Sequence, residues 1–187
     1  MRSSKIKVVV DAMGGDFAPH NVVLGAYEAI REKGSSIEII LSGPEKIILD
    51  ELKKNNIDPN LFTIKDAPDT ITMHDSATTA IKAKKKSSIV VGITLLKDKA
   101  ADAFVSAGNT GAVMTASTLI LGRLKGISRP TIGATLPSQK GFVLLMDAGA
   151  NVECKPNFLF EFAIMGSIFI ENTQNISNPT EIGRAHV

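Results

Sequence analysis

The 187-residue sequence predicts an α/β fold of three layers, α/β/α, in which helices cover both faces of a mostly parallel sheet. Short apolar runs rich in β-branched residues alternate with longer segments whose apolar residues recur at helical spacing, which is typical of βαβ units. The run 6–10 is apolar without interruption at its centre, as expected of a strand buried on both faces. A hydrophobic share of 44% and a charged share of 21% are those of an average globular chain.

The first expected elements form a βαβ pattern. The strand over 6–10 leads into a helix that begins near Pro19, a residue tolerated at the first helical position, and ends at about Lys33 before Gly34. The elements expected next are a strand over 37–41, a charged helix to about residue 54 and a short strand over 61–64. Residues 66–75 then form a loop long enough to carry function.

The second half continues the alternation. Residues 76–86 have a helical pattern, and 87–97 are ambiguous, because their β-branched start favours a strand whereas the later spacing and the closing Lys97 favour a helix, which we prefer. The remaining elements expected are a strand over 103–105, a helix from the loop 106–111 to about 124, two hairpin strands over 131–136 and 142–146, and a helix over about 156–171.

The last of these helices is unusually apolar. Four of the eight phenylalanines fall on it, at 158, 160, 162 and 169, together with several leucine, isoleucine and methionine residues. A helix that is apolar nearly all round is expected to be buried on most sides. It is therefore either a central core helix or part of a subunit interface, and the sequence favours neither.

Composition excludes several classes of function. A net charge of +2, no tryptophan and one tyrosine argue against a nucleic-acid-binding surface. A single cysteine, Cys154, excludes an internal disulfide and a cysteine-rich zinc site, and indicates a reducing, cytoplasmic compartment. Cys154 is more readily interpreted as an inert thiol than as a nucleophile. The three histidines are too scattered for a metal site, so no metal is expected. No cofactor is expected either.

The first loop of chemical interest follows the first strand and contains Asp11, Gly14, Gly15 and Asp16. Paired glycines allow positive φ and a close backbone approach to a ligand. Open α/β sheets bind ligands at the carboxyl ends of their strands, which is where this loop lies. A tight turn with capping acids is the alternative. The glycine spacing does not match a dinucleotide-binding fingerprint.

The second loop, between the strand 103–105 and the next helix, contains Ser106, Gly108, Asn109, Thr110 and Gly111. Its hydroxyls and backbone N–H groups suit phosphate or another small anion, with a purely structural turn as the alternative. It lacks the Gly-Lys-Ser/Thr of a Walker loop and the first glycine of a nucleophile elbow. A third loop, with Asp147 and Asn151, is expected at the same sheet edge.

The only strong local charge run lies at 82–86 and includes Lys84, Lys85 and Lys86. Such a run is usually the solvated face of a helix. The alternative is a docking site for an acidic partner or an anion.

Together these motifs resemble the bacterial acyl-carrier-protein:phosphate acyltransferases, the phosphate acyltransferase family. The resemblance runs from about residue 6 to 179 and rests on several motifs in order. They are the loops at 11–16, 106–112 and 147–151, the Lys-Lys-Lys-Ser-Ser run at 84–88, the stretch from Gly122-Arg123 to Arg129-Pro130, and Cys154-Lys155-Pro156.

The resemblance implies an enzyme that makes acyl phosphate from acyl carrier protein thioesters and inorganic phosphate, for phospholipid synthesis. It implies a fold similar to phosphate acetyltransferase and to the isocitrate and isopropylmalate dehydrogenases, a homodimer, and peripheral membrane association. Phosphate is then the nucleophile, and a thiolate with a pKa of about 8.5 leaves readily.

The resemblance also gives the loop residues roles. Ser106, Gly108, Asn109, Thr110 and Gly111 are expected to contact phosphate or the oxyanion. The residues expected to shape the pocket are Asp11, Gly14, Gly15 and Asp16, with Asp147 and Asn151 orienting them. His74 is a weaker candidate proton donor. Because acyl carrier protein is acidic, Lys84, Lys85 and Lys86 become candidates for docking it.

The sequence departs from the family pattern after Pro179. Family members are nearly twice as long, and 180–187 reads as a tail foreign to the pattern, so that 1–179 is expected to be the amino-terminal part of the enzyme. The missing half is expected to carry the rest of the sheet, much of the acyl site and the membrane-contacting region. Two alternatives stay open: a phosphate acetyltransferase-like enzyme acting on acyl-coenzyme A, and a non-catalytic module that binds acyl carrier protein.

Overall fold

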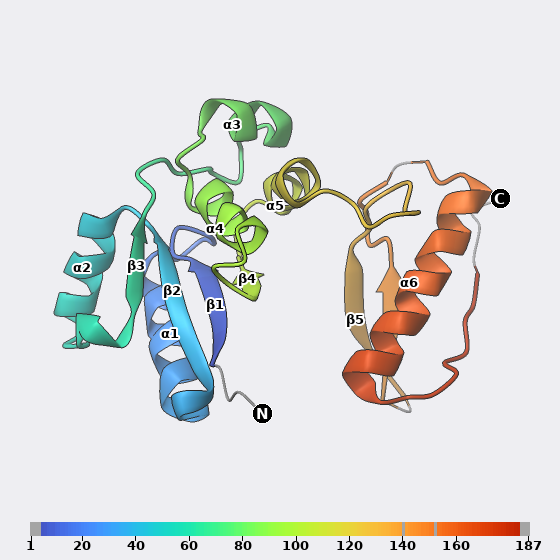
Figure 1. Ribbon diagram of the computed structural model, residues 1–187, viewed down its shortest axis with the longest axis horizontal. Coiled ribbons are helices and arrows are strands. Elements are labelled where there is room, and N and C mark those ends of the chain that lie inside the picture. Colours follow the sequence, from blue (N-terminus) through green and yellow to red (C-terminus); the bar gives the residue numbers. More distant parts are fainter. Residues whose placement is uncertain (1–4, 140, 152, 184–187) are drawn as a thin grey trace. The chain divides into compact units, whose positions relative to one another are not determined.

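The computed structural model describes residues 5–139, 141–151 and 153–183 (Figure 1). The chain divides into two compact units, Met1–Gly122 and Arg123–Val187, which are described separately below. In the described part of the chain, no helix combines the length and the apolar character needed to cross a membrane.

The first unit is built on a four-stranded sheet in which every pairing is parallel. Its strands are β1 (Ile6–Asp11), β2 (Ile37–Gly43), β3 (Thr63–Asp66) and β4 (Ala103–Val105). They lie in the order β3-β2-β1-β4, with Val9 opposite Ile40 of β2 and Phe104 of β4. The prediction of a mostly parallel sheet is confirmed.

Helices cover both faces of this sheet, as the apolar centre of the run 6–10 predicts. On one face, Ile39 and Leu41 pack in a core with α1 (His20–Lys33) and α2 (Glu45–Lys54). On the other, Val9 and Ile40 pack with Leu95 of α4 (Ser88–Lys97). Because successive strand residues point to opposite faces, neighbours such as Ile39 and Ile40 enter different cores. The three-layer prediction holds for this unit.

The remaining helices of the first unit are α3 (Ala77–Ala83) and α5 (Thr110–Ala116), which continues as a π-helical turn over Ser117–Leu121. The helix predicted over 87–97 is confirmed, and Ser87 explains it: its side chain accepts a 3.4 Å hydrogen bond from the Val90 amide and so caps α4. The helix predicted to reach about 124 ends earlier, because Gly122 takes a positive φ of 85°.

The strand expected over 61–64 begins two residues late, at Thr63. Asp58 is the reason, because its carboxylate accepts a 2.9 Å hydrogen bond from the Asn60 amide and caps a 3₁₀ turn over Pro59–Leu61. The helix expected over 76–86 is also shorter than expected, because α3 ends at Ala83, inside the lysine run.

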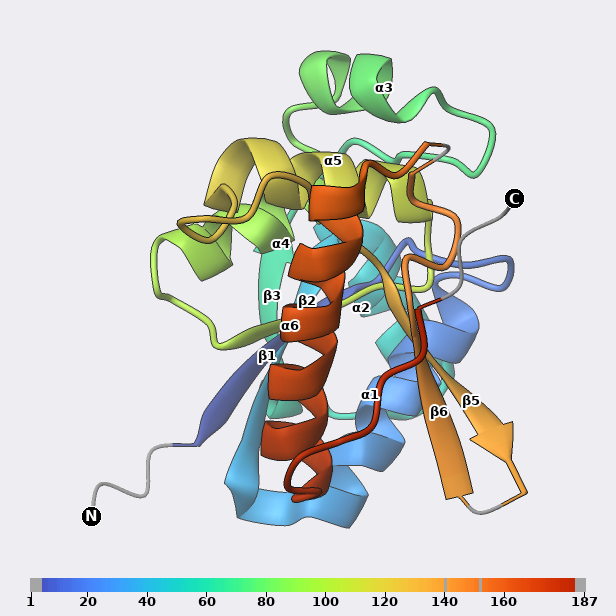
Figure 2. The same ribbon diagram turned by 90° about the vertical axis from the view of Figure 1, so that its right-hand side faces the viewer.

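The second unit contains an antiparallel hairpin, β5 (Gly133–Ser138) and β6 (Gly141–Met146), and the long helix α6 (Pro156–Gln174) (Figure 2). The predicted hairpin is confirmed. Helix α6 packs on β6, where a Cβ placed on Gly166 would lie 3.1 Å from Met146 Cγ. Near the end of the described chain, Glu181 accepts a 2.7 Å hydrogen bond from the Ser167 hydroxyl.

Of the two alternatives for α6, the central core helix is wrong for the described part of this chain. Phe162, Gly166 and Ile170, four residues apart, form its buried stripe. Phe160 is 69% exposed, and the other exposed apolar side chains are Leu159, Ile164, Ile168 and Phe169. Hydropathy alone could not show that only one stripe of this helix has a partner in the chain. A role in a subunit interface stays a prediction.

Candidate functional site

The two glycine-containing loops of the first unit lie against each other. They follow β1 and β4, which are adjacent parallel strands, so both begin at the same edge of the sheet. The Asp11 carboxylate, only 2% exposed, accepts a 2.7 Å hydrogen bond from the Ser106 hydroxyl and a 3.1 Å bond from the Met13 amide. A buried carboxylate of the first loop thus holds the second.

Gly14 lets the loops approach. A Cβ at this position would lie 2.6 Å from Asp11 Oδ2 and 2.8 Å from the Gly108 nitrogen. The Gly108 amide in turn donates to Ser106 Oγ at 3.0 Å, and Gly15 has a φ of +107°. The structure therefore brings together five residues predicted from the sequence, Asp11, Gly14, Gly15, Ser106 and Gly108.

Ser106 is engaged within the protein. A hydroxyl has one proton, which Ser106 gives to Asp11, while its oxygen accepts from Gly108. Its predicted contact with phosphate would require that proton to change partner. The Thr110 side chain, in the part of the same loop where α5 starts, is exposed. Of the two hydroxyls predicted to meet an anion, the Thr110 hydroxyl is the freer donor.

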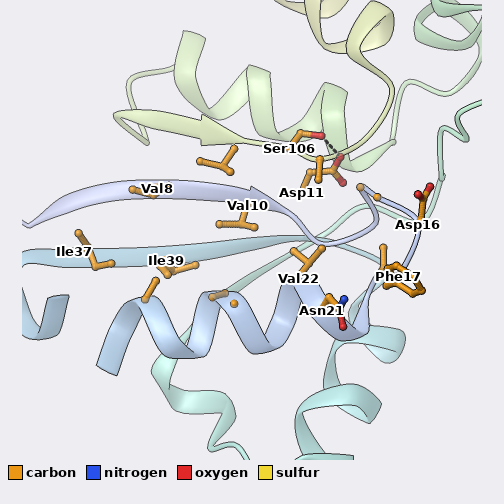
Figure 3. A pocket seen from close by; sticks show the side chains of 18 residues that line it. Val8, Val10, Asp11, Asp16, Phe17, Asn21, Val22, Ile37, Ile39 and Ser106 are labelled. Atoms are coloured by element: carbon orange, nitrogen blue, oxygen red, sulfur yellow. Dashed lines mark hydrogen bonds between the residues drawn. The ribbon is translucent and has the colours of Figure 1, made fainter. Parts of the chain in front are cut away.

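A cavity of about 520 Å³ opens beside these loops, between α1 and the sheet (Figure 3). Its lining includes Val8 and Val10 of β1, Ile37 and Ile39 of β2, and Gly25 and Ala29 of α1. Asp11, Asp16 and Ser106 line the end formed by the loops, where Asp16 is exposed. The cavity was not predicted, although a glycine inside a helical pattern, Gly25, was a signal for it.

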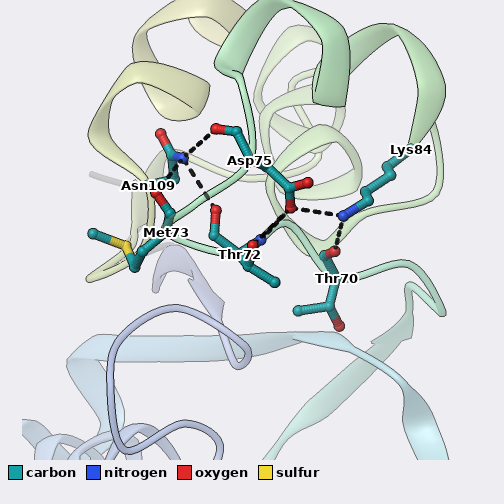
Figure 4. Close-up of polar contacts among 6 residues, drawn as sticks. All are labelled: Thr70, Thr72, Met73, Asp75, Lys84 and Asn109. Carbon is teal, nitrogen blue, oxygen red and sulfur yellow. Dashed lines mark hydrogen bonds and ion pairs between the residues drawn. The ribbon is translucent and has the colours of Figure 1, made fainter.

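Asn109 holds a distant loop to the start of α5 (Figure 4). Its side-chain oxygen accepts from the Ala112 amide at 3.0 Å, which caps the helix. Its amide group donates to the carbonyls of Thr72 and Asp75, each at 3.1 Å, and approaches that of Met73 at 3.5 Å. Direct contact of this side chain with phosphate stays a prediction, and one that requires these bonds to open.

The loop held by Asn109 has a second anchor in Lys84. Its ammonium contacts Asp75 Oδ2 at 2.7 Å and donates to the Thr70 carbonyl at 2.8 Å. Asp75 Oδ2 also accepts from the amide and hydroxyl of Thr72, at 2.7 and 3.0 Å. Lys84, predicted to dock a partner, is thus paired inside the unit, whereas Lys85 and Lys86 are exposed. His74 is exposed on this loop.

We expect the Asp75–Lys84 pair to make the free energy of unfolding depend on pH in the acid range. The Lys84 ammonium, and then the amide and hydroxyl of Thr72, lower the pKa of Asp75 from 3.8 to about 2. A folded-state pKa below the unfolded value stabilises the fold at higher pH, and that contribution is lost as pH falls from about 4 to about 2. The free energy of unfolding in urea should fall more steeply over this interval in the native chain than in Asp75→Asn. Equal slopes would contradict the assignment.

The third predicted loop lies in the second unit. Asn151 donates to Asp147 Oδ1 at 2.9 Å and to the Pro130 carbonyl at 3.2 Å. The expectation that this loop shares a sheet edge with the other two is wrong, because β6 pairs with β5 in a separate hairpin.

Burial, and then a hydrogen bond to Asp147, raise the pKa of the Cys154 thiol, in agreement with an inert cysteine.

Among residues 5–139, 141–151 and 153–183, no group of three or more histidine, cysteine, aspartate or glutamate side chains is arranged to hold a metal ion. Gly111, the last residue predicted in the anion loop, lies close to α3, where an added Cβ would be 3.3 Å from Ala77 Cβ.

Residues 6–185 match the protein family described as "Fatty acid synthesis protein". The chain is 48% identical over 175 residues to the phosphate acyltransferase of Clostridium novyi (strain NT), covering 94% of this chain and 52% of that protein. It is 48% identical over 176 residues to the phosphate acyltransferase of Chlorobaculum parvum, with the same coverage. The chain therefore spans about half the length of these curated relatives.

Among solved structures, the chain is similar to a phosphotransacetylase from Streptococcus pyogenes. The TM-score is 0.66 at 18% sequence identity, over 92% of this chain and 55% of that one. The EutD phosphotransacetylase from Staphylococcus aureus gives a TM-score of 0.59 at 16% identity, over 89% of this chain and 53% of that one. The predicted likeness to the phosphate acetyltransferase fold is confirmed.

Proposed function

The chain belongs to the family described as "Fatty acid synthesis protein", and from this premise we propose that it is the part of a phosphate acyltransferase that holds phosphate for attack on an acyl thioester. The observation that carries the proposal is the contact between the loops after β1 and β4, made by Asp11, Gly14, Ser106 and Gly108. The curated relatives named phosphate acyltransferase support the reaction class.

In the proposed reaction, a phosphate oxygen attacks the thioester carbonyl carbon. The carbonyl becomes a tetrahedral oxyanion, the carbon–sulfur bond breaks, and the sulfur leaves as a thiolate that takes up a proton. The products are an acyl phosphate and a free thiol. Since a thiolate leaves readily, no covalent intermediate with the enzyme is needed, and the protein contributes positioning and donors to the developing charge.

The chain's residues divide that work. The Thr110 hydroxyl and the backbone N–H groups of 109–111 are the proposed donors to phosphate or the oxyanion. Asp11 and Ser106 fix the loop that carries them, and Asn109 fixes the loop over 72–75 beside it. His74 is exposed on that second loop and remains the candidate proton donor.

Thr110 offers the most direct test. Thr110→Ala should lower kcat/KM for phosphate-dependent acyl phosphate formation by roughly 100-fold, because it removes one donor to developing charge. Thr110→Ser should restore most of the rate, and Thr63→Ala, exposed on β3, should leave it unchanged. The assay compares this chain with the full-length Clostridium novyi relative, using acyl carrier protein and coenzyme A thioesters as donors.

Three results would count against the proposal. One is a chain that forms no acyl phosphate with either donor while the relative does. The second is an equal kcat/KM in Thr110→Ala and the native chain. A clear preference for coenzyme A thioesters would replace the proposed donor and favour a phosphate acetyltransferase-like enzyme.

We propose acyl carrier protein as the thioester donor, and Lys85 and Lys86 as residues that dock it. Both side chains are exposed and basic, whereas Lys84 is paired with Asp75. Lys85→Glu with Lys86→Glu should raise the KM for acyl carrier protein thioesters at least tenfold and leave that for phosphate unchanged. Lys53→Glu with Lys54→Glu on α2 is the matched control. An unchanged KM in the first pair would exclude this docking surface.

We also propose that the enzyme serves phospholipid synthesis. In this proposal it is a cytoplasmic homodimer that associates peripherally with the membrane. The apolar side chains exposed on α6 give a dimer or a membrane contact a surface. Sedimentation velocity of the chain, with and without phospholipid vesicles, measures both.

A further inference from the structure

We propose that the cavity between α1 and the sheet is a groove for the acyl chain of the substrate, and that Gly25 and Ala29 set the chain length it accepts. This inference rests on the proposed function, because it assigns a location to the apolar part of the thioester. Its test separates the two proposals.

The groove begins at the candidate site. Asp11 and Ser106 line its end, and Val10 and Val8 continue its lining back along β1 (Figure 3). Three residues of strand from Asp11 to Val8 correspond to roughly 10 Å. On the other wall, the helix from Asn21 to Ala29 covers about 12 Å. A chain attached to a carbonyl at the loops could therefore extend along the groove.

The walls away from the loops are apolar. Val8 and Val10 are half-buried, and Val105 at the end of β4 is 54% exposed, so α1 covers this side of the face only in part. Ile37 and Ile39 of β2 complete this side. Such a surface offers an alkyl chain burial from water and no hydrogen-bonding partner. The chemistry therefore matches the tail of a fatty acyl group, with the polar end of the groove at its carbonyl.

Small residues keep the groove open. Gly25 and Ala29 are one helical turn apart and share a face of α1. A Cβ added to Gly25 would meet nothing within 4 Å, so a larger side chain there would extend into space without displacing a neighbour. Glycine also weakens a helix interior, which makes a leucine at this position favourable for the helix itself. Gly25→Leu is therefore a variant that should fold and fill the groove.

Calorimetric titration of the 187-residue chain with inorganic phosphate and with hexyl, octyl, decyl and dodecyl phosphate tests the assignment. In the native chain, Kd should fall roughly fourfold for each added methylene until the groove is full. In Gly25→Leu, dodecyl phosphate should bind at least 100-fold more weakly than in the native chain, with inorganic phosphate unchanged within twofold. Ala29→Leu should act in the same direction. Arg31→Leu, on the same helix outside the groove, is the control.

The outcomes are distinguishable. If inorganic phosphate does not bind the native chain, the proposed function fails. If phosphate binds but Kd does not depend on chain length, or Gly25→Leu keeps the native dependence, the groove proposal is overturned and the proposed function stands. If Gly25→Leu instead converts a dimer to a monomer in sedimentation, with no dependence on chain length in the native protein, a second copy occupies the groove, and the acyl assignment is again overturned. Thermal unfolding of Gly25→Leu, expected at or above the native Tm, confirms that the variant is folded.

Discussion

Gly14→Ala should abolish phosphate binding and lower the free energy of unfolding by about 1–3 kcal/mol, the usual cost of forcing an atom into a packed site. The added Cβ would lie 2.6 Å from Asp11 Oδ2 and 2.8 Å from the Gly108 nitrogen. One of these atoms belongs to a buried carboxylate and the other to the backbone, so neither can move away cheaply. The loops after β1 and β4 must then separate, and with them the donors proposed to hold phosphate.

Urea unfolding and phosphate titration of the same variant measure the two effects. Gly25→Ala is the control, because its Cβ enters open space within a helix, and it should raise stability by roughly 0.5–1 kcal/mol. A Gly14→Ala protein with native stability and native phosphate affinity would show that the close contact between the loops is not needed.

Asn109→Ala is expected to have the second large effect, a loss of about 2–4 kcal/mol of stability. The substitution removes the cap on the Ala112 amide and leaves the carbonyls of Thr72 and Asp75 without their donor, at a position that is 9% exposed. The loop over 72–75 should then detach from α5. Its amide hydrogens should exchange with solvent faster, while those of the sheet strands keep their native protection.

Asn109→Ser separates the two functions of this side chain. Serine is as good a cap as asparagine but is too short to reach the 72–75 loop, so it should recover about 1 kcal/mol relative to alanine. Hydrogen exchange over 72–75 should stay fast in both variants. Native exchange rates there in Asn109→Ala would show that Asn109 does not anchor the loop, and that the Asp75–Lys84 pair suffices.

The sheet could be predicted from the sequence because its signal is local. A strand buried on both faces has an uninterrupted apolar run, and 8–10 and 39–41 both have this pattern. The ambiguous 87–97 was assigned correctly as a helix, and Ser87 supplies the cap that supports this interpretation. The hairpin at 133–146 was also predictable, because Gly141, with a φ of +126°, marks its turn.

Contacts between distant residues set the limit of sequence-based prediction. The amide of Asn109 bonds to a carbonyl 37 residues away, so no local pattern distinguishes an anchor from a phosphate ligand. Lys84 shows the same limit, because its charge run suggested an exposed face while its partner lies nine residues earlier, in a loop. Helix α6 shows a related limit: hydropathy measures how apolar a helix is, but not whether its own chain or a partner covers it.

The candidate site was predicted in part. Loops after adjacent parallel strands must meet at one edge of a sheet, which is why Asp11 and Ser106, 95 residues apart, could be placed together from the sequence. The same reasoning failed for Asp147 and Asn151, because it assumed that β6 joins the parallel sheet.

The loops over 11–16 and 106–111 are proposed to form one phosphate site. The most direct measurement is a titration of the isotope-labelled chain with inorganic phosphate, followed through its backbone amide resonances. We expect saturable shifts concentrated at 14–16 and 106–111, reduced in Thr110→Ala and absent in Gly14→Ala. Shifts centred on other residues, or none at phosphate concentrations that saturate the Clostridium novyi relative, would contradict it.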